Sequence, residues 1–305
     1  MSGKISFAEV EYGQKGGAAM SWLEDIVSSL KYMEGHLTDE LTLEEIAATV
    51  NLSPFYFQKG FSILCGVTVS EYIRNRRLSL AGRDLQIDGC KVIDAAMKYG
   101  YDSPDSFTKA FTRFHGITPA QAKNGEGDLK YFLPLQVHLF MKGGFEMECR
   151  IVKKPAFTVI GSAKLIKNES GYSECPQFWT EHYTQGNGKY ICGMYGICWD
   201  SDTPEGFFKY MIADDYVPKK EMPEGFEKAV IPEHTWAVFP CRGPMPEALQ
   251  KVNTEIFSEW LPGNSDYEIA GMYSIEYYTP ACDYPKGNQD ENYYCEIWMP
   301  VKSKH

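Results

Sequence analysis

The sequence lacks the marks of a membrane, secreted or zinc-binding protein. None of its apolar runs reaches the roughly 18 residues that cross a bilayer, and no charged segment followed by an apolar one opens the chain. Its nine cysteines include no C-x-x-C pair, and Cys192 and Cys198 have the wrong spacing for a zinc knuckle. We therefore expect a cytoplasmic protein with no membrane contact, reduced cysteines, and neither a metal nor another cofactor.

Catalytic signatures are equally scarce. No G-x-S-x-G turn, H-E-x-x-H motif or phosphate-binding loop occurs in the 305 residues. His182 and His234 stand alone, without the spacing of metal ligands. The sequence therefore favours a binding protein over an enzyme, and no residue is assigned a catalytic role.

Length and charge divide the chain into two parts. Its 305 residues are about twice the usual domain size. Nearly all of the net charge of −11 belongs to residues 124–305, which carry 17 basic and 26 acidic side chains. Residues 71–123 instead hold nine basic and six acidic groups. This modest basic patch suits contact with phosphates, and ordinary surface solvation is the alternative explanation.

Periodicity predicts an all-α part followed by an α+β part. Between residues 22 and 121, apolar side chains recur at steps of three and four, as on helices that bury one face. Further on, β-rich runs alternate with helical stretches that we expect near residues 175–184, 204–212 and 246–260. The expected divisions are a tail or expression remnant at 1–19, a helical domain at 20–123, a linker at 124–145 and an α+β domain at 146–305.

The helical part contains an internal repeat. SPFYFQKGF at 53–61 matches SPDSFTKAF at 103–111, and the offset is fifty residues. Phe57 and Phe61 lie one helical turn apart and therefore share a face that points to the core, as do their counterparts in the second unit. The pattern predicts two helix-turn-helix units, each with an exposed second helix that can enter a major groove.

A long helix over residues 69–85 is expected to separate the two units. At 1.5 Å per residue it spans roughly 25 Å, which sets the two reading helices about one DNA turn apart. Its basic stripe, RNRR at 74–77, favours a DNA role because phosphate contacts need such groups. A helical bundle with a duplicated packing unit and no DNA role is the alternative.

Residues 22–122 resemble the DNA-binding domain of AraC/XylS transcriptional regulators. The resemblance rests on LEEIAATVNLSPFYFQKGF, YIRNRRLSLAGRDL and VIDAAMKYGYDSPDSFTKAFTRFHGITPAQAK. It implies that one chain, with two reading helices, can bind an asymmetric site as a monomer. The DNA-binding residues that it implies are Phe55, Gln58 and Lys59 on the first reading helix, Pro104, Asp105, Ser106 and Lys109 on the second, and Arg74, Arg76 and Arg77 between them. Asp105 departs from the long amide side chains of the family, so we expect the first helix to supply more of the selectivity.

Residues 146–302 resemble the GyrI-like effector-binding domain. The segments that carry this resemblance are MECRIVKKPAFTVIG, YGICWDSD, IPEHTWAVFPCRGPMPEALQ, EWLPGNSDYE and YYCEIWMPV. The resemblance implies an antiparallel sheet, a pseudo-twofold duplicated β–α–β–β unit and a cleft between its halves. A helical regulator followed by a sensor is the arrangement of the Rob-type subset of the AraC family.

Aromatic walls and strand carboxylates in the second part predict a site for a small hydrophobic cation. Side chains two apart on a strand share a face, so Glu296 lies with Tyr294 and Trp298 and is the first candidate for the carboxylate. Glu276 is the second. The candidate walls are Trp199, Phe207, Tyr210, Trp236, Tyr294 and Trp298. Alternatives are an edge-strand charge in water for Glu296 and a core position for Trp236.

The sequence and the two resemblances together predict a ligand-responsive, DNA-binding transcriptional regulator, an activator by its family. Its expected partners are double-stranded DNA, a small-molecule effector and RNA polymerase. The competing hypothesis is an enzyme, because some GyrI-like domains hydrolyse electrophilic toxins and a glutamate among aromatics can activate water. A third hypothesis is a protein–protein inhibitor resembling gyrase binders.

Overall fold

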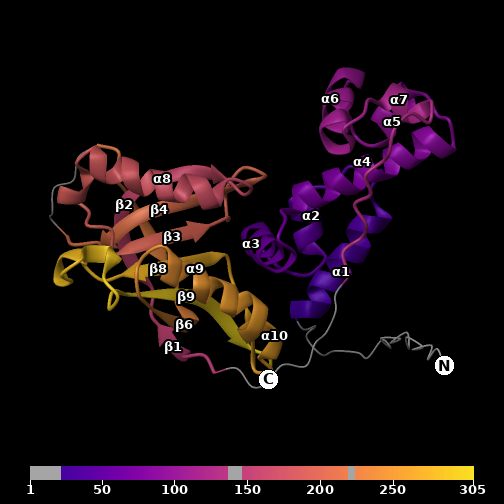
Figure 1. Ribbon diagram of the computed structural model, residues 1–305. Helices are drawn as coiled ribbons and strands as arrows, with labels where there is room; N and C mark the ends of the chain where they lie inside the picture. The colour runs from indigo at the N-terminus through magenta and orange to yellow at the C-terminus, as the bar shows by residue number, and fades with distance from the viewer. Residues whose placement is uncertain (1–21, 137–145, 219–223) are drawn as a thin grey trace.

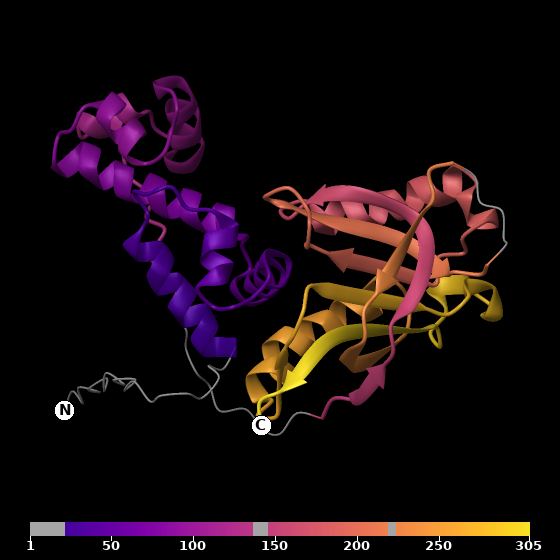
Figure 2. The same cartoon turned by 180° about the vertical axis from the view of Figure 1, so that it is seen from behind.

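The computed structural model describes residues 22–136, 146–218 and 224–305, and it consists of a helical part and a sheet part (Figures 1 and 2). The tail expected at 1–19 lies outside the described residues. In the described part of the chain, no helix is long and apolar enough to cross a membrane. The helices of the first part are α1 (Trp22–Gly35), α2 (Leu43–Ala48), α3 (Pro54–Cys65), α4 (Val69–Ile87), α5 (Val92–Lys98), α6 (Pro104–His115) and α7 (Pro119–Lys123).

The repeat in the sequence is confirmed by matching helix ends. At the start of α3 the Ser53 side chain accepts a hydrogen bond from a backbone N–H three residues on, and Ser103 does the same at the start of α6. Each helix then begins with proline, whose missing N–H costs nothing there. Both helices end at a glycine in the left-handed region, Gly66 (φ 70) and Gly116 (φ 85). The two units are therefore the same supersecondary motif.

Part of the segment expected as a linker runs along the helical domain. The Phe132 ring packs edge-on against Tyr72, with ring centroids 5.9 Å apart, and the Phe132 N–H donates to Ser79 Oγ of α4 at 3.1 Å. The Lys130 N–H donates to His115 Nδ1 of α6 at 3.2 Å. Residues 130–132 thus tie this segment to both α4 and α6.

The second part is built on one antiparallel sheet. Its strands are β1 (Arg150–Lys154), β2 (Phe157–Lys167), β3 (Tyr195–Trp199), β4 (Phe207–Asp215), β5 (Glu227–Ile231), β6 (His234–Arg242), β7 (Tyr267–Ile269), β8 (Tyr273–Tyr278) and β9 (Tyr294–Ser303). The order is β1-β6-β9-β8-β3-β4-β2-β5, with β7 paired to β9. About the β8–β3 pair this order repeats itself: β2-α8-β3-β4 on one side corresponds to β6-α9-β8-β9 on the other. This is the duplicated β–α–β–β unit that the resemblance implied.

Two helices cover the same face of this sheet (Figures 1 and 2). They are α8 (Gly171–Thr184) and α9 (Glu247–Glu255), and α9 continues through a π-helical turn at Ile256–Trp260 into α10 (Leu261–Gly263). The helices expected near 175–184 and 246–260 are therefore present. The helix expected at 204–212 is wrong, because β4 occupies most of it. Residues 210–213 of this central strand are all buried, so this run lacks the alternation that marks a half-exposed strand.

The hydrophobic cores do not follow the division into two parts. Phe107 and Phe111 of α6 belong to a separate core of the second helix-turn-helix unit. Phe61 of α3 instead shares one core with Phe239 of β6 and Phe257 of the π-helical turn. The first helix-turn-helix unit is thus packed into the sheet domain, and both views show α3 beside that domain with α6 far from it (Figures 1 and 2).

Candidate effector cavity and DNA-reading helices

A cavity of ≈ 450 Å³ lies between α8 and α9, with strands β3, β4 and β8 as its floor. This volume is within the range of small-molecule sites. The side chains that matter below are Cys175, Trp179 and Tyr183 from α8, Leu249 from α9, Cys198, Phe208, Tyr210, Glu276 and Tyr278 from the strands, and Phe55, Gln58 and Lys59 from α3. Helix α3 of the DNA-binding part therefore contributes to a cavity of the sheet part.

Glu276 is the carboxylate of this cavity. Its Oε2 accepts hydrogen bonds from Tyr278 Oη at 2.7 Å and from Tyr210 Oη at 3.3 Å. Trp179 Nε1 donates to Tyr210 Oη at 2.7 Å and so orients the phenol. Gly196 leaves the space for this arrangement, since a Cβ there would lie 2.5 Å from Tyr210 Oη. The carboxylate is held in one orientation by aromatic side chains that are themselves fixed.

The cavity contains little charge apart from this group. Among the described residues that line it, Glu276 and Lys59 are the two charged side chains. Burial, with Glu276 nearby, raises the pKa of the Cys175 thiol far above its usual range and that of Cys198 as well, so both thiols stay neutral. Within the described residues, Glu276 has no ion pair closer than 4.0 Å. A negative group without a paired cation thus faces an aromatic, largely uncharged space.

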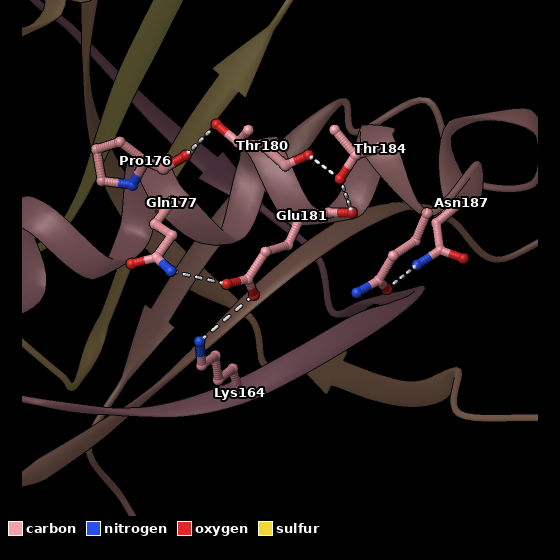
Figure 3. Close-up of polar contacts among 8 residues, drawn as sticks. Lys164, Pro176, Gln177, Thr180, Glu181, Thr184 and Asn187 are labelled. Atoms are coloured by element: carbon pink, nitrogen blue, oxygen red, sulfur yellow. Dashed lines mark hydrogen bonds and ion pairs between the residues drawn. The ribbon is translucent and has the colours of Figure 1, made fainter.

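Helix α8 is held in place by polar contacts on its outer side (Figure 3). Gln177 Nε2 donates to Glu181 Oε1 at 3.0 Å, and Lys164 Nζ of β2 pairs with Glu181 Oε2 at 3.5 Å. Thr180 Oγ1 donates to the Pro176 carbonyl, one helical turn earlier, at 3.1 Å. With its polar side tied to β2, α8 presents Trp179 to the cavity.

The structure brings only part of the predicted ligand set together. Glu276 and Tyr210 line the cavity, but Glu296, Trp298 and Tyr294 do not, because they lie on the opposite face of the sheet. Strand β9 directs its intervening residues, such as Ile297, toward the helices. The remaining predicted walls, Trp199, Phe207 and Trp236, also lie outside this cavity, and Trp236 is a fully buried core residue.

Glu296 has its own partners on that opposite face. It is 5% exposed and accepts hydrogen bonds from Tyr294 Oη and Trp298 Nε1, both at 2.6 Å, and it pairs with Arg150. Burial acts to raise the pKa of Glu296, but these three donors outweigh it and hold the pKa below its usual value. The charge of Glu296 is thus compensated by the Arg150 ion pair, whereas Glu276 has no ion-pair partner among the described residues. Residues of α3 and α8 were missed as walls, because a cavity between elements leaves no mark on any single strand pattern.

The expectation that both reading helices are exposed is wrong for α3. Gln58 is only 5% exposed and Tyr56 is fully buried. The Phe55 N–H donates to Asp200 Oδ2 at 3.0 Å, and the rings of Phe55 and Phe208 lie 5.0 Å apart. The sheet domain therefore buries Gln58 and half-buries Phe55 and Lys59, the residues of α3 that were predicted to contact bases. The reason is tertiary: α3 is amphipathic in its own unit, but its second face is apolar enough to pack on another domain.

Two further hydrogen bonds and one close packing contact hold this surface. Tyr56 Oη donates to the Tyr273 carbonyl at 2.6 Å, and the Gly206 N–H donates to Glu44 Oε1 at 2.8 Å. At Gly60, a Cβ would lie 2.3 Å from the Trp22 ring and 2.8 Å from the Phe257 ring. The absence of a side chain at this position allows α1, α3 and the π-helical turn to meet.

Helix α6 presents the opposite picture. Pro104, Asp105, Ser106 and Lys109 are all exposed. Its buried side consists of Phe107 and Phe111, as the repeat predicted. The predicted base-contacting residues of the second unit thus lie on an open surface, and their role in DNA binding stays a prediction.

The three predicted arginines of α4 differ from one another. Arg76 is buried and forms a bidentate pair with Glu34, both contacts at 2.8 Å. Arg77 donates to the backbone carbonyls of Leu37 and Asp39 at 2.7 and 2.6 Å. Arg74 is exposed. Two of the three guanidinium groups are therefore bound inside the domain, and Arg74 is the one open to a phosphate.

The pairing of Glu34 is strong enough to perturb its titration. Burial acts to raise the pKa of Glu34, but hydrogen bonds from Arg76 and Tyr72 lower it below its usual value. The Tyr72 Oη donor lies 2.7 Å from Glu34 Oε1. This network joins α1 to α4.

Comparison with known proteins identifies both parts. A family described as "Integron-associated effector binding protein" matches residues 150–301, and one described as "Helix-turn-helix domain" matches residues 46–125. The HTH-type transcriptional activator AarP of Providencia stuartii is 40% identical over 91 residues, 30% of this chain and 67% of that protein. The Right origin-binding protein of Escherichia coli is 26% identical over 295 residues, 90% of this chain and 96% of that protein.

One solved structure is similar to about half of the chain. A bacterial transcription regulation protein from Staphylococcus aureus covers 52% of this chain and 99% of its own, at 22% identity and a TM-score of 0.41. The relatives and the family are transcription regulators, which points away from an enzyme. The chain belongs to the AraC/XylS family of helix-turn-helix transcriptional regulators and carries a C-terminal GyrI-like effector-binding domain.

Proposed function

We propose that this chain is a ligand-responsive transcriptional regulator whose effector is a lipophilic, aromatic cation. The observation that carries the proposal is Glu276, a carboxylate oriented by Tyr278 and Tyr210 inside a cavity with aromatic walls. A desolvated negative group attracts an organic cation, and aromatic faces add cation–π attraction of about 0.5–2 kcal/mol each. Burial of the apolar groups of such a ligand supplies the rest of the binding free energy.

A matched pair of glutamates tests this assignment. Binding of tetraphenylphosphonium to the full chain is measured by isothermal titration calorimetry, with Glu276→Gln and Glu296→Gln as variants. Loss of the charge at 276 should weaken binding at least about tenfold, or about 1.4 kcal/mol. Glu296→Gln should bind as the unmodified chain does, since Glu296 already has three partners on the other face. Equal affinity of Glu276→Gln and the unmodified chain would refute the cation site.

DNA binding is assigned first to α6, whose candidate residues are exposed. Lys109 of α6 and Arg74 of α4 are exposed positive groups, and neutralising phosphates with such groups makes affinity fall steeply with salt. Anisotropy titrations of the chain with DNA from its own promoter region, at several salt concentrations, test this. Binding without salt dependence, or no binding at any salt or ligand concentration, would contradict it.

Activation of transcription, through contact with RNA polymerase, is the regulatory direction that we propose. Its support is the family itself and the relative AarP, which is a transcriptional activator. In vitro transcription from the promoter, with and without tetraphenylphosphonium, measures the direction. A fall in transcript on addition of the chain would make it a repressor instead.

A further inference from the structure

Three residues of α3 that are predicted to contact DNA bases also line the effector cavity. Phe55, Gln58 and Lys59 are the side chains that the sequence assigns to base contacts, and all three line the cavity of the effector-binding domain. The matching positions of α6 are Asp105, Thr108 and Lys109, which line no part of it. One surface of α3 therefore belongs to both the DNA-reading motif and the cavity wall.

The shared wall brings a positive charge, Lys59, to the cavity. Lys59 Nζ lies over the Phe55 ring, 5.7 Å from its centroid. The Cys175 thiol is within electrostatic range of both Lys59, which acts to lower its pKa, and Glu276, which acts to raise it. Cys198 is influenced by the same two groups. Among the described residues that line the cavity, Lys59 is thus the single positive side chain and Glu276 the single negative one.

One polar anchor, Asp200, holds the first turn of this wall. Asp200 Oδ2 accepts the Phe55 N–H in the first turn of α3, where a negative charge is favourable. The other oxygen, Oδ1, is buried with no hydrogen-bond partner among the described residues. Burial raises the pKa of Asp200, and the Phe55 N–H acts against that rise. An anchor with an unsatisfied buried oxygen contributes little net stability, so the closed arrangement depends mainly on the apolar packing of α3 against the sheet domain.

We propose that the α3 surface formed by Phe55, Gln58 and Lys59 is shared between effector cavity and DNA, and that a cationic effector displaces it from the cavity. Lys59 acts as a tethered cation in the empty cavity. A ligand cation beside Glu276 repels the Lys59 ammonium and takes over its electrostatic role, which frees α3 to enter the major groove. The inference rests on the proposed function, since it needs a cationic effector at Glu276.

The energetics are those of a population shift. A ligand moves the equilibrium only by the ratio of its affinities for the open and closed forms. A tenfold preference, about 1.4 kcal/mol, already changes the open fraction several-fold when that fraction is small. DNA that binds the open form should in turn raise the affinity for the ligand by the same factor.

Lysine acylation of the full chain tests the shared surface, because the repeat supplies a matched pair of lysines. Lys59 and Lys109 occupy equivalent positions, and Lys109 is exposed. The rate of reaction of each with an N-hydroxysuccinimide acetate is read by peptide mass spectrometry. Without ligand, Lys59 should react at least about fivefold more slowly than Lys109, because reaction waits for local opening. Equal rates in the free chain would overturn the proposal.

A release variant gives a second, ligand-independent measurement. Asp200→Ala removes the acceptor for the Phe55 N–H, and it should bring the Lys59 rate close to that of Lys109. The control is Glu205→Ala, which removes an exposed carboxylate in the turn that follows Asp200, and it should leave both rates unchanged. Phe208→Ala is a second release variant, because it removes the ring that packs on Phe55. If Lys59 reacts as slowly in both variants as in the unmodified chain, these two contacts do not hold α3 and the proposal fails.

Tetraphenylphosphonium then separates this proposal from the one on which it rests. At saturation, established by calorimetry, the probe should raise the Lys59 rate several-fold and leave Lys109 unchanged. Binding of the probe with an unchanged or slower Lys59 rate overturns the displacement and leaves the cation site standing. Absence of binding refutes the cation site, and with it the displacement by a cation, whereas the free-chain and Asp200→Ala rates still decide whether α3 is occluded.

Discussion

Helices α3 and α6 begin with the same Ser-Pro pair, end at a left-handed glycine and bury the same two phenylalanines, yet they have different surroundings. Gln58 of α3 is 5% exposed against the effector-binding domain, whereas Lys109 of α6 is exposed. The difference teaches that a repeated motif specifies a unit and its caps, but not which of its faces remains free. In this chain the copy next to the sheet domain is covered and the distant copy is open.

The largest effects should come from the equivalent core residues Phe61 and Phe111, which are both fully buried. Replacement of either by alanine should cost about 3–5 kcal/mol of local stability. Phe61→Ala should also loosen β6 and the π-helical turn, since Phe61 shares a core with Phe239 and Phe257. Phe111→Ala should loosen only the second unit. Hydrogen exchange resolved by segment measures this, and identical exchange of β6 in both variants would break the comparison.

The next largest effect should distinguish Arg76 from Arg74 of α4, since the first should matter for stability and the second for DNA binding. Arg76→Ala should destabilise the chain by about 3 kcal/mol in urea unfolding, because it leaves Glu34 without its buried partner. Arg74→Ala should leave stability within about 0.5 kcal/mol and instead weaken binding to DNA of any sequence. If Arg76→Ala unfolds at the same urea concentration as the unmodified chain and loses DNA affinity, its predicted phosphate role holds and the buried pair matters little.

A smaller effect compares the two lysines at equivalent positions in DNA binding. Without effector, Lys109→Ala should weaken DNA binding and reduce the salt slope by about 1, while Lys59→Ala should change neither. With saturating tetraphenylphosphonium, Lys59→Ala should begin to weaken binding too. Anisotropy titrations in parallel measure all four cases, and a full loss for Lys59→Ala in the absence of effector would show that α3 is already free.

The smallest effect is a pH dependence of the free energy of unfolding, and its source is Asp25 of α1. Burial, then Glu24 and Glu268, raise the pKa of Asp25 from its usual 3.8 to about 7, and Lys304 acts in the opposite direction. The folded chain therefore holds a proton that the unfolded chain has lost, so stability should fall as pH rises from about 4 to 7 and stay lower above. For this half-buried group the loss should be about 1 kcal/mol after solvent screening. Asp25→Asn should flatten thermal stability across this window, and an unchanged slope would contradict the assignment.

Much of the architecture could be predicted from the sequence because its causes are local. The offset of fifty residues and the Ser-Pro pairs specified two units with the same helix ends. The two-residue period of a strand likewise accounts for the position of Glu276 on the same face of β8 as Tyr278. These features depend on neighbours within a few positions along the chain.

The parts that could not be predicted depend on distant partners. Glu296 pairs with Arg150, 146 residues away, and Arg76 pairs with Glu34, 42 residues away. Neither spacing leaves a periodic signal. Strand β4 was read as a helix because burial on both faces removes its alternation. The cover on α3 likewise comes from Asp200 and Phe208, far along the chain.

A substitution at Gly60 offers a way to change how α3 packs on the sheet domain. Its counterpart in the second unit is Ala110, so the two copies differ by one methyl group at this point. At position 60 that methyl would act as a wedge between the indole of Trp22 and the phenyl ring of Phe257. Gly60→Ala should therefore push α3 away from the π-helical turn, while the side chains of Phe55, Gln58 and Lys59 themselves are left unchanged.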